Sequence, residues 1–169
     1  MEKVMEKTLL FVGLATVLCL CTPGSNACTG ITLKAKDGSF VFGRTLEFAH
    51  KMDSEVIVIP RNIKFNGVTP SGTNGLQWKS KVAAVGANFN DTPVIIDGIN
   101  EKGLSCGMFY FPDFADYQST VNSDFPRTIA PWQLATWILT NFKSVSEVKE
   151  NLPKIKVANV VFKKWNMVI

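Results

Sequence analysis

Residues 28–48 read CTGITLKAKDGSFVFGRTLEF, and this stretch decides the fold. Apolar and polar residues alternate on each side of Asp37-Gly38, a dipeptide that suits the tight turn of a β-hairpin. The pattern predicts strands over 31–36 and 39–44. A hairpin that begins at Cys28 returns its second strand beside its own first residue.

The segment before this hairpin has the features of a secretory signal peptide over residues 1–27. An apolar run over residues 8–21 follows two lysines, and helix breakers and small residues lead up to Ala27. The run is shorter than the roughly 18 to 20 residues of a spanning helix, so we expect no stable membrane anchor. Cleavage after Ala27 would export the chain to the periplasm or the extracellular space, with Cys28 as its first residue.

The chain is β-rich up to about residue 110. Apolar runs separated by Gly, Pro and Asn predict mainly antiparallel strands there. One such run is TPVIIDGINEKGLSCGMFYF (92–111), with Asn100 in a tight turn between two strands. Because hairpin-like turns join neighbouring strands, the sheet is expected to be antiparallel.

Helical patterns follow this β-rich part. IAPWQLATWILTNF (129–142) has apolar residues at helical spacing, and SVSEVKENLP (144–153) opens on a capping box of Ser144 and Glu147. KIKVANVVF (154–162) returns to strand. This order predicts a layered α+β domain.

Composition argues against several other classes of function. The net charge of +4 comes from scattered basic residues, with only Lys163 and Lys164 adjacent, so we expect no nucleic-acid binding. His50 is the only histidine and has no companions at metal-ligand spacing, so no metal site is expected.

A cysteine at a new N-terminus carries both a thiol and a free α-amine. An α-amine has a reference pKa of about 7.7 to 8.0, so it can act as the base for its own nucleophile. The thiolate of Cys28 would attack an amide carbonyl, and water would later hydrolyse the thioester. Arg44 would lower the thiol pKa, and Glu47 would accept a hydrogen bond from the amine.

Two simpler interpretations compete with this chemistry. Arg44 and Glu47 can be a solvated ion pair at a strand end, which is the commoner role of such residues. Cys28 and Cys106 can form a disulfide in a secreted, non-enzymatic binding domain, and this would remove the nucleophile. The pattern alone does not decide between them.

Three blocks together resemble the choloylglycine hydrolase family, which contains bile salt hydrolases and penicillin V acylases. They are the opening stretch, DSEVIVIPRN (53–62) and DGINEKGLSCGMFYF (97–111). The resemblance runs from Cys28 to the last residue. It implies an N-terminal nucleophile hydrolase with an αββα sandwich, of which residues 28–169 are the N-terminal half. It also implies a small amide substrate with a hydrophobic acyl group, and neither cofactor nor metal.

The resemblance assigns roles to particular residues. Cys28 matches the nucleophile, Arg44 the arginine beside it, and Glu47 a position where better-known members have aspartate. Tyr110 matches the residue whose backbone N–H contributes to the oxyanion hole. It is tyrosine in penicillin V acylases and usually asparagine in bile salt hydrolases, which slightly favours an acylase. Asn100 belongs to the motif with an expected structural role as cap of its turn.

Family members are roughly twice as long as this chain. The half that is missing carries a second oxyanion asparagine and a further active-site arginine, so an inactive remnant is a third interpretation. For a full-length form the resemblance implies a homo-oligomer.

Overall fold

The computed structural model describes residues 28–47, 52–72, 74–109, 111, 114–162 and 167–168. The predicted signal peptide, His50 and Tyr110 lie outside the described residues. The element order from the hairpin to the last strand follows the predicted change from strands to helices and back to strand.

The opening stretch forms a hairpin as predicted, with antiparallel strands β1 (Gly30–Lys34) and β2 (Phe40–Arg44). The first strand ends two residues before the predicted bound of 36, because the Ala35 N–H bonds to the Ser39 carbonyl and the loop is longer than the Asp37-Gly38 dipeptide. The Asp37 carboxylate accepts hydrogen bonds from the backbone N–H of Ser39 at 2.9 Å and from its hydroxyl at 2.6 Å. Gly38 has a φ of 87°, which only glycine adopts without strain. The local turn chemistry therefore fixes the register of the two strands.

A four-stranded sheet with the order β3-β6-β7-β8 forms the centre of the structure, and every pair in it is antiparallel. Its strands are β3 (Val56–Ile59), β6 (Ala84–Ala87), β7 (Asp97–Asn100) and β8 (Ser105–Gly107).

The β-rich run predicted over 92–111 starts as strand only at Asp97. Ile96 already hydrogen-bonds to the flanking segments, because its N–H donates to the Ala87 carbonyl and its carbonyl accepts from the Met108 N–H, both at 2.9 Å. Val94 and Ile95 are buried and lie outside the strand. The reason is a helix side chain, since the Thr136 hydroxyl accepts a hydrogen bond from the Ile95 N–H at 2.7 Å. The helix thus takes a backbone group that a neighbouring strand would otherwise bind.

The first predicted helix begins as a 3₁₀ turn, η2 (Pro131–Gln133), and continues as α2 (Leu134–Asn141). Proline fits at this start because it has no N–H to donate and its φ suits a helix. Leu139, fully buried, packs against the four-stranded sheet, while Trp137 packs in a separate apolar cluster. The helix is therefore buried on more than one side.

The second predicted helix is α3 (Val145–Asn151), which runs into the 3₁₀ turn η3 (Leu152–Lys154). The Ser144 hydroxyl accepts a hydrogen bond from the Glu147 N–H at 3.3 Å, as the capping box predicts. The Glu147 carboxylate accepts from the N–H of Lys143 at 2.8 Å, one residue before the expected donor. The predicted start of the helix at Ser144 is thus confirmed, although the Glu147 side chain bonds to the N–H of Lys143 and not to that of Ser144.

Three small sheets complete the described residues. Strands β4 and β5 pair antiparallel, β9 and β10 pair parallel, and β11 and β12 pair antiparallel. A further 3₁₀ turn, η1, leads into β9. The bounds are β4 (Lys64–Asn66), β5 (Gln77–Lys79), η1 (Asn122–Arg127), β9 (Thr128–Ile129), β10 (Lys156–Val157), β11 (Val161–Phe162) and β12 (Met167–Val168).

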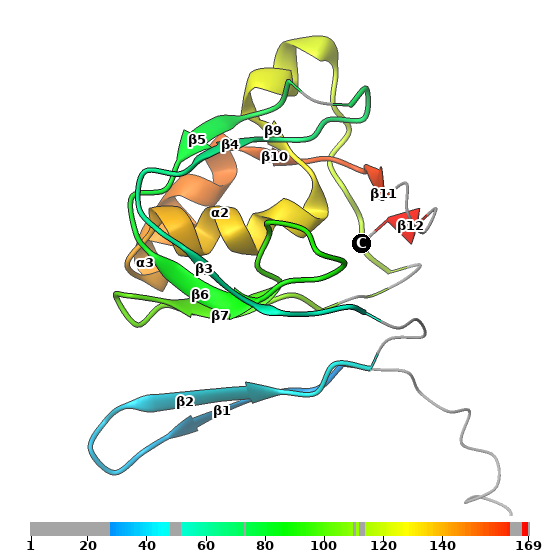
Figure 1. Ribbon diagram of the computed structural model, residues 1–169. Helices are drawn as coiled ribbons and strands as arrows, with labels where there is room; N and C mark the ends of the chain where they lie inside the picture. The colour runs from blue at the N-terminus through cyan, green and yellow to red at the C-terminus, as the bar shows by residue number, and fades with distance from the viewer. Residues whose placement is uncertain are drawn as a thin grey trace, which may run out of the picture.

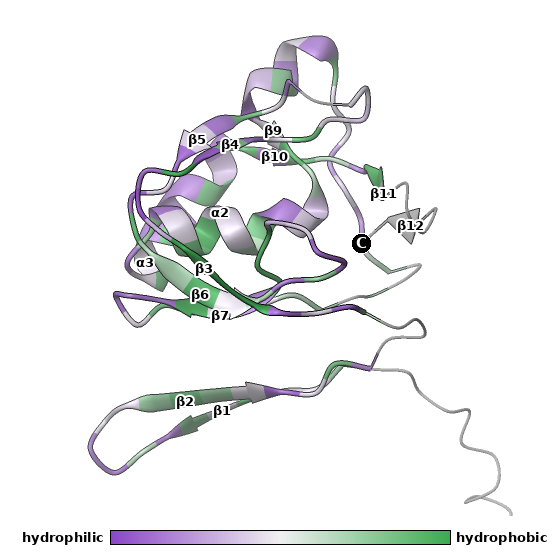
Figure 2. Ribbon diagram, in the orientation of Figure 1, coloured by the Kyte–Doolittle hydropathy of each residue, from purple (hydrophilic) through white to green (hydrophobic). Residues whose placement is uncertain are grey.

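The main elements are arranged in layers (Figure 1). Helix α2 covers one face of the four-stranded sheet, and the hairpin lies on the opposite side of that sheet. Figure 2 shows hydrophobic residues along the hairpin strands. By strand alternation Ile31, Leu33 and Val41 share the face that points away from the sheet, where they are 54%, 56% and 59% exposed. The described residues thus form the helix, sheet and sheet layers of a sandwich, with the outer face of the hairpin uncovered.

The ion pair between Arg61 and Glu101 makes the stability of the fold depend on pH. Arg61 and the Ala83 N–H bind the Glu101 carboxylate and lower its pKa from 4.5 to about 2. Because the folded-state pKa is depressed, this contribution is present above pH 4.5 and is lost as the pH falls toward 2. The melting temperature of Glu101→Gln is expected to fall less between pH 5 and 2 than that of the unaltered chain. Glu150→Gln on the exposed side of α3 serves as the control, and identical pH profiles for all three chains would contradict the assignment.

Candidate active site

Cys28 lies directly before β1 and is half-buried. Its Sγ is 3.8 Å from the backbone carbonyl oxygen of Glu47. The strand ladder continues past β1, because the Thr45 N–H donates to the Thr29 carbonyl at 2.9 Å. Continued by two residues, the register puts Leu46 opposite Cys28, and the backbone of Glu47 comes next to it.

Arg44 belongs to the same face of the hairpin as Cys28. Side chains alternate between the faces of a strand, so Cys28 and Gly30 share a face, and Gly30 pairs directly with Arg44. Diagonal neighbours on one face lie roughly 7–8 Å apart. The predicted nucleophile and the predicted arginine are thus neighbours through the local fold alone.

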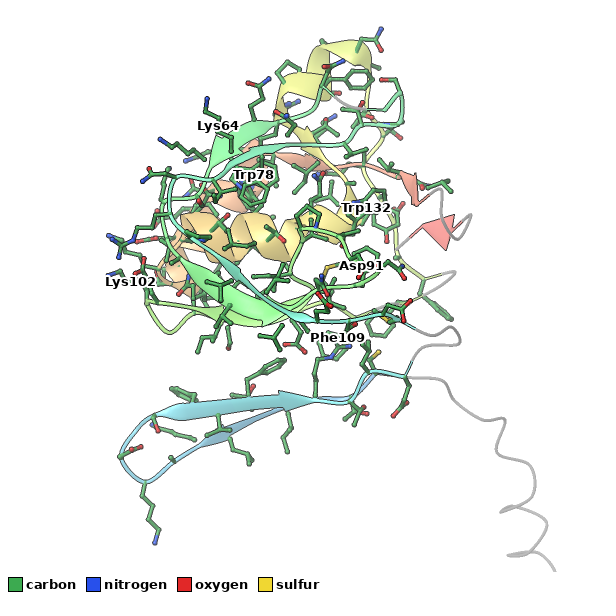
Figure 3. The ribbon with its side chains drawn as sticks, viewed as in Figure 1. Lys64, Trp78, Asp91, Lys102, Phe109 and Trp132 are labelled. Atoms are coloured by element: carbon green, nitrogen blue, oxygen red, sulfur yellow. The ribbon has the colours of Figure 1, made fainter. Side chains whose placement is uncertain are left out.

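The guanidinium of Arg44 is buried between the hairpin and the sheet, with only 5% of its side chain exposed. Its Nε is 3.5 Å from Oδ2 of Asp97, and its Cζ is 4.9 Å from the ring centroid of Phe109. Figure 3 shows Phe109 in the space between the two layers. The interpretation of Arg44 as a solvated surface charge is therefore wrong.

This guanidinium has spare hydrogen-bonding capacity. Within the part of the chain that the structure describes, no nitrogen of Arg44 makes a hydrogen bond. Asp97 lies near Nε only, and buried N–H groups without acceptors are costly, so the Nη groups suit an anionic or carbonyl oxygen.

A cavity of about 400 Å³ separates the hairpin from the sheet beside this arginine. Thr32 and Phe42 line it from the hairpin, and Val85, Asp97 and Ile99 line it from the sheet. The walls are mostly apolar, with Asp97 as the carboxylate among them. Burial raises the pKa of Asp97, and the positive charge of Arg44 opposes that shift.

Cys106 lies on the other side of the sheet. It packs with Ile59 and Leu139 in the apolar cluster under α2, and burial raises its pKa to about 11. Both Cys28 and Cys106 are free thiols in the structure, and the side chain of Cys106 lies on the face of the sheet that packs against α2. The structure thus places Cys106 in the core and shows no Cys28–Cys106 disulfide.

Sequence reasoning did not single out Asp97 and Phe109, although both belong to the block over 97–111. The available signal was a carboxylate at the start of an otherwise apolar strand. Tyr110, the predicted oxyanion residue, lies outside the described residues, and the Glu47 side chain is exposed at the end of the hairpin.

Comparison with known families decides the classification. The profile of the linear amide C–N hydrolases, choloylglycine hydrolase family, matches residues 28–168. The chain belongs to the choloylglycine hydrolase family. The match to this family begins at Cys28, the first residue of the predicted mature chain.

Individual members of the choloylglycine hydrolase family support this result. A bile salt hydrolase/transferase of Clostridium perfringens is 40% identical over 134 residues, which are 79% of this chain and 39% of that protein. A crystal structure of a mutant conjugated bile acid hydrolase from Clostridium perfringens matches with a TM-score of 0.63 and 32% identity, over 79% of this chain and 40% of that one. A penicillin V acylase from Agrobacterium tumefaciens shares the fold, with a TM-score of 0.55 at 22% identity over 80% and 38% of the two chains.

These matches confirm the predicted fold, the αββα sandwich of N-terminal nucleophile hydrolases. The match covers 39% of the length of the Clostridium perfringens relative. Among the described residues of this choloylglycine hydrolase family member, no helix is long and apolar enough to cross a membrane. The same residues contain no group of three or more potential metal ligands.

Proposed function

We propose that this chain is the N-terminal part of a hydrolase of linear, non-peptide C–N amide bonds, with Cys28 as the nucleophile. The observation that carries the proposal is the family match that begins at Cys28. The buried guanidinium of Arg44 on the same face of the hairpin supports it.

In the proposed reaction, cleavage after Ala27 frees the α-amine of Cys28. The amine takes the thiol proton as Sγ bonds to the amide carbonyl carbon, and it returns the proton to the leaving nitrogen when the C–N bond breaks. Water then hydrolyses the thioester, which releases a carboxylic acid and restores the thiol. Atoms and protons balance without a cofactor.

The other predicted residues assist this chemistry. Arg44 favours the thiolate and offers N–H groups to an oxygen of the substrate. Glu47 receives a hydrogen bond from the α-amine, with a side chain one methylene longer than the aspartate expected there. The backbone N–H of Tyr110 contributes to the oxyanion hole, where loss of one donor typically costs about 10² to 10³ in rate.

The proposed substrate is an N-acyl amide with a hydrophobic acyl group. Curated relatives that match most of this chain carry the names bile salt hydrolase/transferase and conjugated bile acid hydrolase. Conjugated bile salts are therefore the first candidates, and penicillin V is the second because of Tyr110. The apolar walls of the cavity between hairpin and sheet suit such an acyl group.

The test uses the chain expressed with residues 1–27. N-terminal sequencing and intact mass of the exported protein are expected to show a chain that begins at Cys28, and iodoacetamide is expected to modify this residue. The exported protein is then incubated with a conjugated bile salt or penicillin V, and release of the amine is measured. A chain that begins at another residue would overturn the mechanism. A correctly processed chain that releases no amine from either compound would support the inactive remnant.

A further inference from the structure

Two glycines allow the hairpin and the sheet to interlock around Arg44. A Cβ atom on Gly107 would lie 3.1 Å from Cζ of Phe42 and 3.6 Å from Cδ of Arg44. A Cβ atom on Gly30 would lie 2.6 Å from Cζ of Phe109. Each layer therefore has a notch that receives a side chain of the other.

The strand pairing places Asp97 at this junction. Gly107 pairs with Asp97 across β7 and β8, just as Gly30 pairs with Arg44 across the hairpin. Arg44 thus enters the notch of the sheet beside a carboxylate. Within the described residues, the only salt bridge of Arg44 is with Asp97.

The nitrogens of the Arg44 guanidinium lie in two different environments. Oδ2 of Asp97 faces Nε at 3.5 Å, and the ring of Phe109 lies against the guanidinium carbon. Nη1 and Nη2 are buried and have no acceptor among the described residues. A guanidinium is planar and rigid, so a contact at Nε also sets the direction of both Nη groups.

We propose that Asp97 is a positioning residue that holds Arg44 beside Cys28 with the Nη edge available to an anionic or carbonyl oxygen of the substrate. Asp97 makes no bond to the reacting atoms in this scheme. The inference rests on the proposed roles of Arg44 and Cys28, but its test does not require hydrolysis.

The test compares the rates at which iodoacetate and iodoacetamide alkylate Cys28. The first reagent is an anion and the second is neutral, so the ratio of the two rates reports positive charge beside the thiol. Mass spectrometry of the Cys28 peptide gives both rates, and Cys106 in the core is a slow internal reference. Arg44→Met defines the ratio without the guanidinium.

The rate ratio in Asp97→Asn distinguishes two roles of Asp97. A role in positioning Arg44 and a role as a negative charge alone predict opposite changes in that ratio. If Asp97 only adds negative charge, its removal raises the iodoacetate to iodoacetamide ratio. If Asp97 positions Arg44, the ratio falls about fivefold, toward that of Arg44→Met. Asp97→Glu, whose longer side chain can reach Nε, is expected to restore most of the ratio. A ratio that rises in Asp97→Asn would overturn the proposal.

Glu101→Gln is the matched control, since it removes an equal charge from the turn after the same strand, where the carboxylate binds Arg61. Its ratio is expected to equal that of the unaltered chain. In the Arg44→Met background, Asp97→Asn is expected to cause no further fall, because the two residues act through one contact.

The unaltered chain provides a second measurement if Asp97→Asn does not fold. The pKa of Asp97 is raised, so its carboxyl takes up a proton at a higher pH than an exposed aspartate. Arg44 from β2 faces it, and the Cys106 thiol lies behind it on β8. The alkylation ratio at Cys28 is expected to fall as the pH decreases through this titration. A ratio that stays constant or rises there would overturn the proposal as well.

Discussion

Cys28→Ala is expected to abolish amide hydrolysis by the exported chain. Loss of the nucleophile removes the thioester route, and comparable losses in hydrolases that act through covalent intermediates are on the order of 10⁴-fold or more. Amine release from the preferred substrate, measured with excess enzyme over a long incubation, gives the size of the effect. Cys28→Ser keeps the shape of the side chain and is expected to be nearly as inactive, because a hydroxyl is a weaker nucleophile without a stronger base.

Cys106→Ala is the matched control for this variant. Cys106 packs in the core on the helix side of the sheet, so its removal is expected to leave the rate unchanged. Acid quenching of the reaction in the unaltered chain should trap the thioester. Mass spectrometry is then expected to find the mass of the acyl group on the peptide that contains Cys28. Full activity in Cys28→Ala, or an acyl group on a different residue, would refute the proposed nucleophile.

Asn100→Ala is expected to be the most destabilising of the variants considered. The buried Asn100 side chain, 4% exposed, donates to the carbonyls of Leu139 at 2.9 Å and Phe142 at 2.7 Å. Its Oδ1 accepts from the N–H groups of Lys102 at 3.0 Å and Leu104 at 3.1 Å. The amide thus ties the turn between β7 and β8 to the C-terminal end of α2, which confirms its predicted structural role.

The alanine variant leaves backbone groups buried without partners, and an unsatisfied buried group costs about 1–3 kcal/mol. We expect a loss of about 3–5 kcal/mol in the free energy of unfolding, measured by urea denaturation. Asn66→Ala, an exposed asparagine that contributes only its backbone carbonyl to Gln133, should cost less than about 0.5 kcal/mol. Equal costs for the two variants would show that the Asn100 network does not stabilise the fold.

Much of the fold could be predicted because its signals are local. Asp37-Gly38 specifies the hairpin turn, and Ser144 with Glu147 specifies the start of α3. Each depends on residues a few positions apart, so the sequence contains the whole interaction. The prediction of strand over 92–95 was wrong, because the N–H of Ile95 bonds to Thr136, which lies far along the chain.

Some residues of the candidate site could likewise be predicted from local sequence. The sequence determined that Cys28 begins a hairpin whose returning strand carries Arg44 and Glu47. The structure decided the register, since Lys34 pairs with Phe40 and this puts Arg44 opposite Gly30, on the same face as Cys28. The sequence motifs also identified the choloylglycine hydrolase family, which the comparison confirmed over residues 28–168.

Only the tertiary structure decided which groups meet across the layers. It placed Asp97 and Phe109 against Arg44 and put Cys106 on the opposite side of the sheet. A strand shows alternation but not which of its faces meets the hairpin and which meets the helix. That choice depends on packing between segments distant in sequence, where Gly30 and Gly107 leave room for the side chains of the facing layer.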